Sequence, residues 1–186
     1  MRADAVANRE AIVRAAVSLY ADVGPSVSLR AVASRAGVGI GTLYRHFPDR
    51  VSLLRGVAEH VHARVSEAVS AYEAADPAVE AARRWRAFVT ELVGLRLGRI
   101  IPQMAADPAL LEDNPWLITM RNDGLDRLDG ALSLAKAEGL VREEVDVTRF
   151  QVGLAQISRP LGRFVDEVVP GWQDWLVDTY LRGLRP

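Results

Sequence analysis

The sequence contains no cysteine, no long apolar run and only one lysine. Without a thiol there can be no disulfide framework, cysteine-based zinc site or thiol nucleophile. No apolar run approaches the ~18 residues that would cross a membrane. Residues 1–10 are polar and lack the apolar core of a secretory signal, so we expect a cytoplasmic protein that binds no membrane. The 186 residues suffice for one domain, or for two small ones that share a core.

Charge of either sign is not in large excess, because the net charge is −1. This excludes a globally basic protein that coats nucleic acid and an acidic disordered tail. The charge is nevertheless uneven. Residues 1–50 hold seven arginines and four acidic residues, a net +3, and the remainder carries −4. Such asymmetry favours a nucleic-acid partner for the N-terminal part. Its basic side chains are all arginine, the better bidentate donor.

The apolar residues follow helical spacing, and no alternating strand pattern of useful length is present. Residues 12–23 form one apolar stripe that ends at Gly24-Pro25. Ser28 is a good N-cap for a short helix over 29–36, and Gly37 is suited to the turn that ends it. A third short helix is predicted over 40–47, and Asp49 can cap a long fourth one. The sequence therefore predicts an all-α fold of about nine helices.

Later helix ends also carry local signals. Asp76-Pro77, Asp107-Pro108 and Asn114-Pro115 each place a capping side chain before a proline, the residue that suits the first helical position. Gly139-Leu140 is typical of a Schellman motif that ends the helix begun at Pro115. Asp146 or Thr148 begins the next helix, and Pro170-Gly171 precedes the last one.

Two short helices joined by a glycine-containing turn, over residues 28–47, form a predicted helix-turn-helix. The second helix of such a motif enters the major groove and presents its N-terminal side chains to base edges. Helical periodicity turns Leu43 and Phe47 inward. It leaves Thr42, Tyr44, Arg45 and His46 outside, where they can contact phosphates and bases.

Other constellations have simpler explanations. Gly37, Gly39 and Gly41 do not form a phosphate-cradling loop, because a helix rather than a strand precedes them. His60 and His62 are two residues apart on a helix and cannot share a metal from that helix alone, so we expect solvated surface residues. No Ser/His/Asp set has local support, and we predict no enzyme, no metal and no cofactor.

The stretch SLRAVASRAGVGIGTLYRHFPDR resembles the N-terminal domain of the TetR family of transcriptional regulators, over about residues 9–55. The resemblance implies a homodimer with a helix-turn-helix DNA-binding domain (1–48) and a helical ligand-binding and dimerisation domain (49–186). Two positions depart from the family pattern. Gly39 stands where Ser or Thr often caps the recognition helix, and Val51 stands where Glu is common. By position, the resemblance implies DNA contacts from Ser28, Arg30, Gly39, Ile40, Gly41, Thr42, Tyr44, Arg45, His46 and Arg50.

Near the C-terminus, apolar residues alternate at spacings of three and four. They are Val147, Phe150, Leu154, Ile157, Leu161, Phe164 and Val168. This seam and the last helix favour a four-helix bundle between two copies, although a core helix of a monomer would show the same spacing. Pro160 should kink the seam or start a fresh helix. The expected dimer residues are Leu154, Ile157, Leu161, Phe164, Trp172, Trp175, Leu176 and Tyr180.

A ligand pocket is expected among large aromatic and methionine side chains, which make adaptable apolar walls. The candidates are Trp85, Phe88, Leu92, Met104, Trp116, Met120 and Phe150. Ordinary core packing explains the same spacing equally well. Arg96, Arg99 and Arg121 are candidates for a positive group near this pocket.

Together with these features, the resemblance to the TetR family implies a repressor that binds a palindromic operator of double-stranded DNA as a homodimer and is released by a largely apolar small molecule. A DNA-binding regulator without an effector, either an activator or a constitutive regulator, is the first alternative. A helical enzyme or interaction module on the same fold is the second.

Overall fold

The structure is a computed structural model that describes residues 2–23, 27–98, 112–159 and 161–186. Within these ranges it contains helices and no strand, which confirms the all-α prediction. The expected helix start at Asp107-Pro108 lies outside the described residues, as do Gly24-Pro25, Arg99, Met104 and Pro160. The helices are α1 Arg2–Asp22, α2 Leu29–Ala36, α3 Ile40–His46, α4 Arg50–Glu73, α5 Ala81–Gly94, α8 Pro115–Ala137, α9 Val147–Ile157, α10 Arg163–Val168 and α11 Trp172–Leu184.

Several helix ends lie where the sequence places them. The Ser28 hydroxyl accepts a hydrogen bond from the Ala31 amide at 3.2 Å. The Asp146 carboxylate accepts one from the Arg149 amide at 2.7 Å, which identifies Asp146 as the cap of α9. Gly139 has a φ of 71°, and the Leu140 amide donates to the Ala135 carbonyl at 2.9 Å, which completes the expected Schellman motif.

Two expected helix starts need correction. The helix expected after Pro77 begins at Ala81 instead, because the Asp76 carboxylate accepts from the Ala78 amide and stabilises a turn there. The Asn114 side chain makes no cap hydrogen bond, and its oxygen accepts from the Trp116 indole at 3.1 Å. The apolar seam is divided between two helices, since α9 ends at Ile157 and α10 begins at residue 163, which agrees with the expectation of a fresh helix within the seam.

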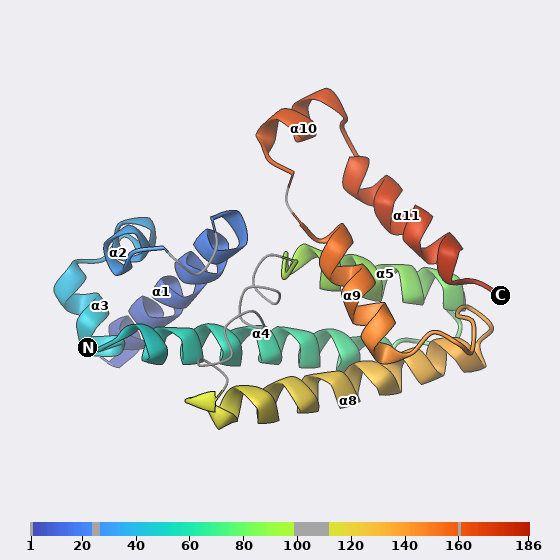
Figure 1. Ribbon diagram of the computed structural model, residues 1–186, viewed down its shortest axis with the longest axis horizontal. Helices are drawn as coiled ribbons and strands as arrows, with labels where there is room; N and C mark the ends of the chain where they lie inside the picture. Colours follow the sequence, from blue (N-terminus) through green and yellow to red (C-terminus); the bar gives the residue numbers. More distant parts are fainter. Residues whose placement is uncertain (1, 24–26, 99–111, 160) are drawn as a thin grey trace.

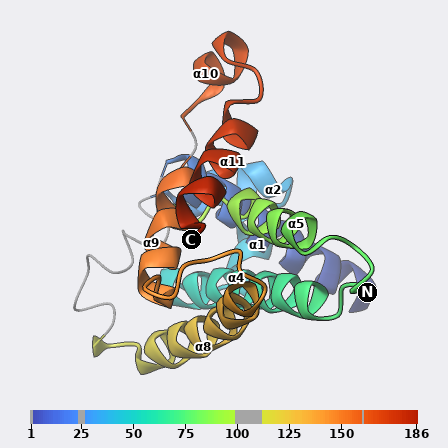
Figure 2. The same ribbon diagram turned by 90° about the vertical axis from the view of Figure 1, so that its right-hand side faces the viewer.

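The long helix α4 organises the molecule (Figure 1). Helices α1, α2 and α3 gather around its N-terminal end, and α8 lies along it toward the opposite end. Figures 1 and 2 show α10 on a protrusion that it shares with the start of α11. No described helix is both long and apolar enough to cross a membrane.

Two apolar cores flank this helix. The first joins α1, α2 and α3 to the start of α4, and it includes Leu53, Leu54 and Val57 as well as Leu117 from α8. The second joins the rest of α4 to α5, α8, α9 and α11. Leu97 packs against both cores, so the segment after α5 links the helix-turn-helix to the C-terminal part.

Candidate nucleic-acid interface and internal cavity

The turn between α2 and α3 has the geometry of a helix-turn-helix. Gly37 has a φ of 70°, in the left-handed region where residues with a Cβ are strained. The Val38 amide donates to the Ala33 carbonyl at 3.1 Å across this turn. Gly39, the N-cap residue just before α3, is in an extended conformation and has no side chain to cap the helix. The first amides of α3 are therefore not covered by a capping side chain from Gly39.

Helix α3 divides into a buried face and an exposed face. Leu43 and Phe47 are buried, and Tyr44 and Ile40 are 49% and 38% exposed. Arg45 is also exposed, whereas Thr42 and His46 are half-buried. Tyrosine, arginine and the helix N-terminus thus share one accessible face, which can donate hydrogen bonds to phosphates and base edges.

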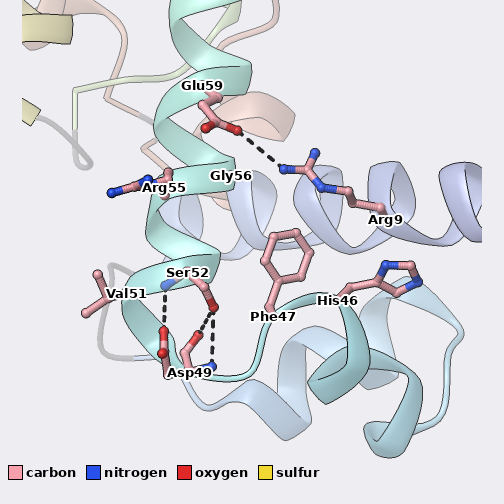
Figure 3. Close-up of a pocket in the computed structure, with 9 residues that line it drawn as sticks. All are labelled: Arg9, His46, Phe47, Asp49, Val51, Ser52, Arg55, Gly56 and Glu59. Carbon is pink, nitrogen blue, oxygen red and sulfur yellow. Dashed lines mark hydrogen bonds and ion pairs between the residues drawn. The ribbon is translucent and has the colours of Figure 1, made fainter. Parts of the chain in front are cut away.

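Phe47 anchors α3 to α1 and α4 (Figure 3). The guanidinium carbon of Arg9 lies 5.3 Å from the centre of the Phe47 ring, and Arg9 also pairs with Glu59 at 3.3 Å. Gly56 faces the same ring. A Cβ at Gly56 would lie 2.8 Å from the Phe47 Cε1 atom, so only glycine permits this close approach. These residues line part of a shallow hollow between the end of α3, α1 and the start of α4 (Figure 3).

The link from α3 to α4 is a complete capping box. The Asp49 carboxylate accepts from the Ser52 amide at 2.7 Å, and the Ser52 hydroxyl accepts from the Asp49 amide at 3.3 Å. Hydrogen bonding of the Asp49 carboxylate by the Ser52 amide, and by its side chain, holds the pKa of Asp49 below its usual value. Arg50 donates to the Val27 carbonyl at 2.6 Å, which ties the start of α4 to the segment before α2.

The structure brings most of the expected DNA contacts together at α2 and α3. Ser28 and Arg30 are exposed at the N-terminal end of α2, and Gly39 to His46 follow across the turn. Arg50 lies at the start of α4 and has a structural hydrogen bond of its own. An ion-pair bridge that the sequence did not suggest adds to this end of the molecule. Asp22 contacts Arg35 of α2 at 3.5 Å and Arg96 at 3.0 Å.

An apolar cavity of about 520 Å³ lies between α4, α5, α8 and α9. Its volume is within the range of ~300–1,000 Å³ that small-molecule sites occupy. Its lining residues are Val57, Ala58, Val61, His62, Val65, Leu92, Leu97, Leu117, Ile118, Met120, Arg121, Gly124, Leu125, Leu128, Gln151, Leu154, Ala155 and Ser158.

The expected pocket residues divide between this cavity and the core. Leu92 and Met120 line the cavity. Trp85, Phe88 and Phe150 are buried in the second core because their rings pack on one another: Trp85 lies 5.5 Å from Phe88 and 5.3 Å from Phe150, centre to centre. Trp116 packs against the first core and under Arg55, whose guanidinium carbon is 4.7 Å from its ring.

Sequence reasoning missed the α4 wall of this cavity. The stripe of Val57, Val61 and Val65 was visible, but only tertiary packing shows that one side of it faces a cavity. His62 is a correction, because its side chain is only 26% exposed and pairs with Asp123 at 3.1 Å instead of lying free in solvent. The Arg127 guanidinium, and to a smaller extent His62, hold the pKa of Asp123 below its usual value.

The expected dimer residues have unequal exposure. Phe164, Trp175 and Leu161 are 75%, 63% and 55% exposed. Ile157, Trp172 and Leu176 are half-buried. Leu154 is buried within the chain and lines the cavity, because the α9 face that carries it turns toward α4 and α8. Tyr180 is also half-buried, and its hydroxyl donates to the Phe150 carbonyl at 2.9 Å; burial raises its pKa.

Comparison with known proteins agrees with this geometry. The model of the family described as bacterial regulatory proteins, tetR family, matches residues 12–57. The transcriptional repressor LfrR of Mycolicibacterium smegmatis is 34% identical over 130 residues, which are 70% of this chain and 66% of LfrR. This chain thus spans just under two thirds of that curated relative.

Solved structures extend the likeness to nearly the whole chain. The TetR-like regulator LfrR of Mycobacterium smegmatis, in complex with proflavine, has a TM-score of 0.69 and 25% identity over 94% of this chain and 92% of that one. The TetR regulator SCO0520 of Streptomyces coelicolor has a TM-score of 0.63 and 28% identity, over 96% and 98% of the two chains.

Proposed function

Because the chain belongs to the TetR family of bacterial transcriptional regulators, we propose that it is a repressor that binds a palindromic operator as a homodimer and leaves it when a small molecule occupies the cavity. The relatives named above are described as regulators of transcription, not as enzymes. The observation that carries the DNA-binding part is the exposed face of α3, held by Phe47 and preceded by the Gly37 turn.

The DNA contacts follow from this face. Residues Gly39 to Gly41 would lie near base edges in the major groove, and Arg45 would face a base or a phosphate. Thr42, Tyr44 and His46 would contact phosphates. Ser28 and Arg50 would contact the DNA backbone, and Arg30 would contact a base or a phosphate. A twofold symmetric pair of such helices, about one DNA turn apart, reads a palindrome.

The effector part depends on the cavity. LfrR has been solved with proflavine, a small aromatic molecule, which supports a small-molecule ligand in a chain of the same fold. A ligand that binds better when the two DNA-binding ends are spaced unlike one DNA turn would shift the population away from the operator. We take the expected domain division at residues 48 and 49 as the working boundary between these two roles.

The test measures binding of the full chain to the DNA upstream of its own gene, across a salt series. We expect specific binding that weakens steeply with salt. Replacing Tyr44 and His46 together by alanine should weaken it at least about tenfold, because two phosphate contacts are lost. Arg83→Gln, which removes an exposed charge from α5, is the control for net charge.

Two results would contradict the proposal: no binding even at low salt, or full binding by the Tyr44→Ala, His46→Ala variant. A thermal-shift screen of small molecules then separates the effector-controlled repressor from a regulator without an effector. A true effector raises the unfolding temperature by mass action and also releases the operator.

A further inference from the structure

Among the described residues, the ionisable side chains that line the cavity are all basic. Of the lining residues only Arg121 and, when protonated, His62 carry charge, and no described aspartate or glutamate lines the cavity. The other polar lining side chains are Gln151 and Ser158, and Ser158 donates its hydroxyl to the Ala155 carbonyl. The remaining described walls are apolar or glycine.

The two basic side chains differ in their partners. His62 is held by Asp123 at 3.1 Å, and Asp123 also accepts from Arg127 at 2.9 Å. That carboxylate is therefore already shared by two partners, His62 and Arg127. Arg121 makes no hydrogen bond or ion pair with any residue that the structure describes, although it lines the cavity.

Arg121 is also exposed, so its side chain lies where the cavity meets solvent. An apolar molecule with an anionic group at one end would bury its body against Val61, Leu92 and Leu128 and bring the anion to this guanidinium. A carboxylate is complementary to the guanidinium in both charge and hydrogen-bonding geometry. A cation in the same place would meet Arg121 and would find no unshared carboxylate on the described walls.

We propose that the cavity selects apolar molecules bearing one anionic group, such as a carboxylate, and that Arg121 is the residue that binds this group. The inference rests on the proposed role of the cavity as the effector site. It adds the chemical class of the ligand and names the residue responsible for selectivity.

The test uses two probes that share an apolar chain and differ in charge: dodecanoate and dodecyltrimethylammonium. Their binding to the full chain is measured by calorimetry at pH 8, below the concentrations at which either forms micelles. A carboxylic acid is fully ionised at this pH and the quaternary ammonium group is permanently charged, so the two probes carry opposite charges.

We expect dodecanoate to bind about tenfold more tightly than the cation, as one charge-assisted contact would provide. Arg121→Gln should bring the two affinities to within about twofold, and Arg121→Glu should reverse the order. Arg83→Gln removes the same charge far from the cavity lining and should leave the preference unchanged. Thermal unfolding of each variant checks that the fold is intact.

Three results would overturn the inference: equal or tighter binding of the cation, a preference for dodecanoate that survives Arg121→Gln, or binding of neither probe. Operator release is measured separately with the same probes. If dodecanoate binds through Arg121 but never releases DNA, the ligand class stands and the proposed effector control fails. If the cation alone releases DNA, effector control stands and the ligand class fails.

Discussion

The contact of Gly56 with Phe47 fixes how the recognition helix sits on α4. A Cβ at Gly56 would come within 2.8 Å of the Phe47 ring, and Val13 is the next neighbour at 3.4 Å. Gly56→Ala should therefore force the ring aside and destabilise the protein by about 1–3 kcal/mol, as overpacking of a core does. Urea unfolding measures the loss, and operator binding should weaken with it.

Gly130→Ala is the matched control on α8. Its nearest heavy atom is a Glu73 side-chain oxygen 3.9 Å away, which leaves room for a methyl group. Alanine in an exposed helix interior should stabilise the chain by about 0.5–1 kcal/mol. Equal effects of the two substitutions would show that Phe47 does not depend on Gly56.

The Asp49 cap predicts a pH dependence. Hydrogen bonds from Ser52 lower the pKa of Asp49 in the folded chain, so its carboxylate favours folding when ionised. This contribution is fully present above the unfolded-state pKa of about 3.9 and is lost as the pH falls through the lower folded value. Asn caps helices equally well without a charge. The difference in unfolding temperature between wild type and Asp49→Asn should thus be constant from pH 7 to 5. Below about pH 4 it should shift against the wild type, because only Asp49 is protonated there. A gap that varies between pH 5 and 7 would contradict this assignment.

At the scale of elements, the sequence predicts best what is decided locally. Ser28, Asp49 and the Gly139-Leu140 pair mark helix ends correctly because each acts within four or five residues of itself. Asn114 shows the limit of such signals, since the nearby indole of Trp116 engages its oxygen instead of a backbone amide.

The position of the cavity could not be predicted from the helical spacing of apolar residues alone. Phe88 and Leu92 are one helical turn apart on α5, yet the first stacks on Tyr72 at 4.9 Å and the second faces the cavity. Both positions read as the same apolar stripe. Which of them meets empty space depends on how α4, α8 and α9 pack, and therefore on contacts far apart in the sequence.

Substitutions can separate core from cavity wall. Phe150 is fully buried between Trp85 and Tyr180, so Phe150→Ala should cost about 3–5 kcal/mol through the void that it leaves. Met120 is half-buried and already borders the cavity, so Met120→Ala should cost well under half as much while changing probe affinity. Chemical denaturation gives the first quantity and calorimetry the second. Similar costs at both positions would place Met120 in the core.

At the scale of the whole molecule, the excess of basic residues and the two most exposed aromatic rings, Phe164 and Trp175, lie in different places. The basic N-terminal residues gather at the α1–α3 end, whereas α10 and the start of α11 project from the other part of the molecule (Figure 1). A net +3 is a modest charge for a reader of DNA. A dimer whose interface lies away from the DNA would place two such basic regions against the DNA. A chain with a near-neutral total charge could then still bind a polyanion.

The protruding apolar side chains predict the site of that joining. Phe164 and Trp175 are 75% and 63% exposed, and burying such rings is the largest apolar gain that this face offers. If the proposed dimer forms through this face, Phe164→Asp with Trp175→Asp should convert it to a monomer in analytical ultracentrifugation. Val79→Asp, at an exposed apolar site elsewhere, should leave it dimeric.

The salt dependence of DNA binding then tests the dimer interface and the DNA-binding surface together. A monomer occupies one half-site, so the slope of log affinity against log salt should fall to about half of the wild-type value. Loss of an interface that has no part in DNA binding would leave the slope unchanged. A variant that stays dimeric would place the interface elsewhere. The slope reflects the counterions released by the phosphate contacts of every bound subunit. A monomer that keeps the full slope would therefore show that one chain makes all the phosphate contacts.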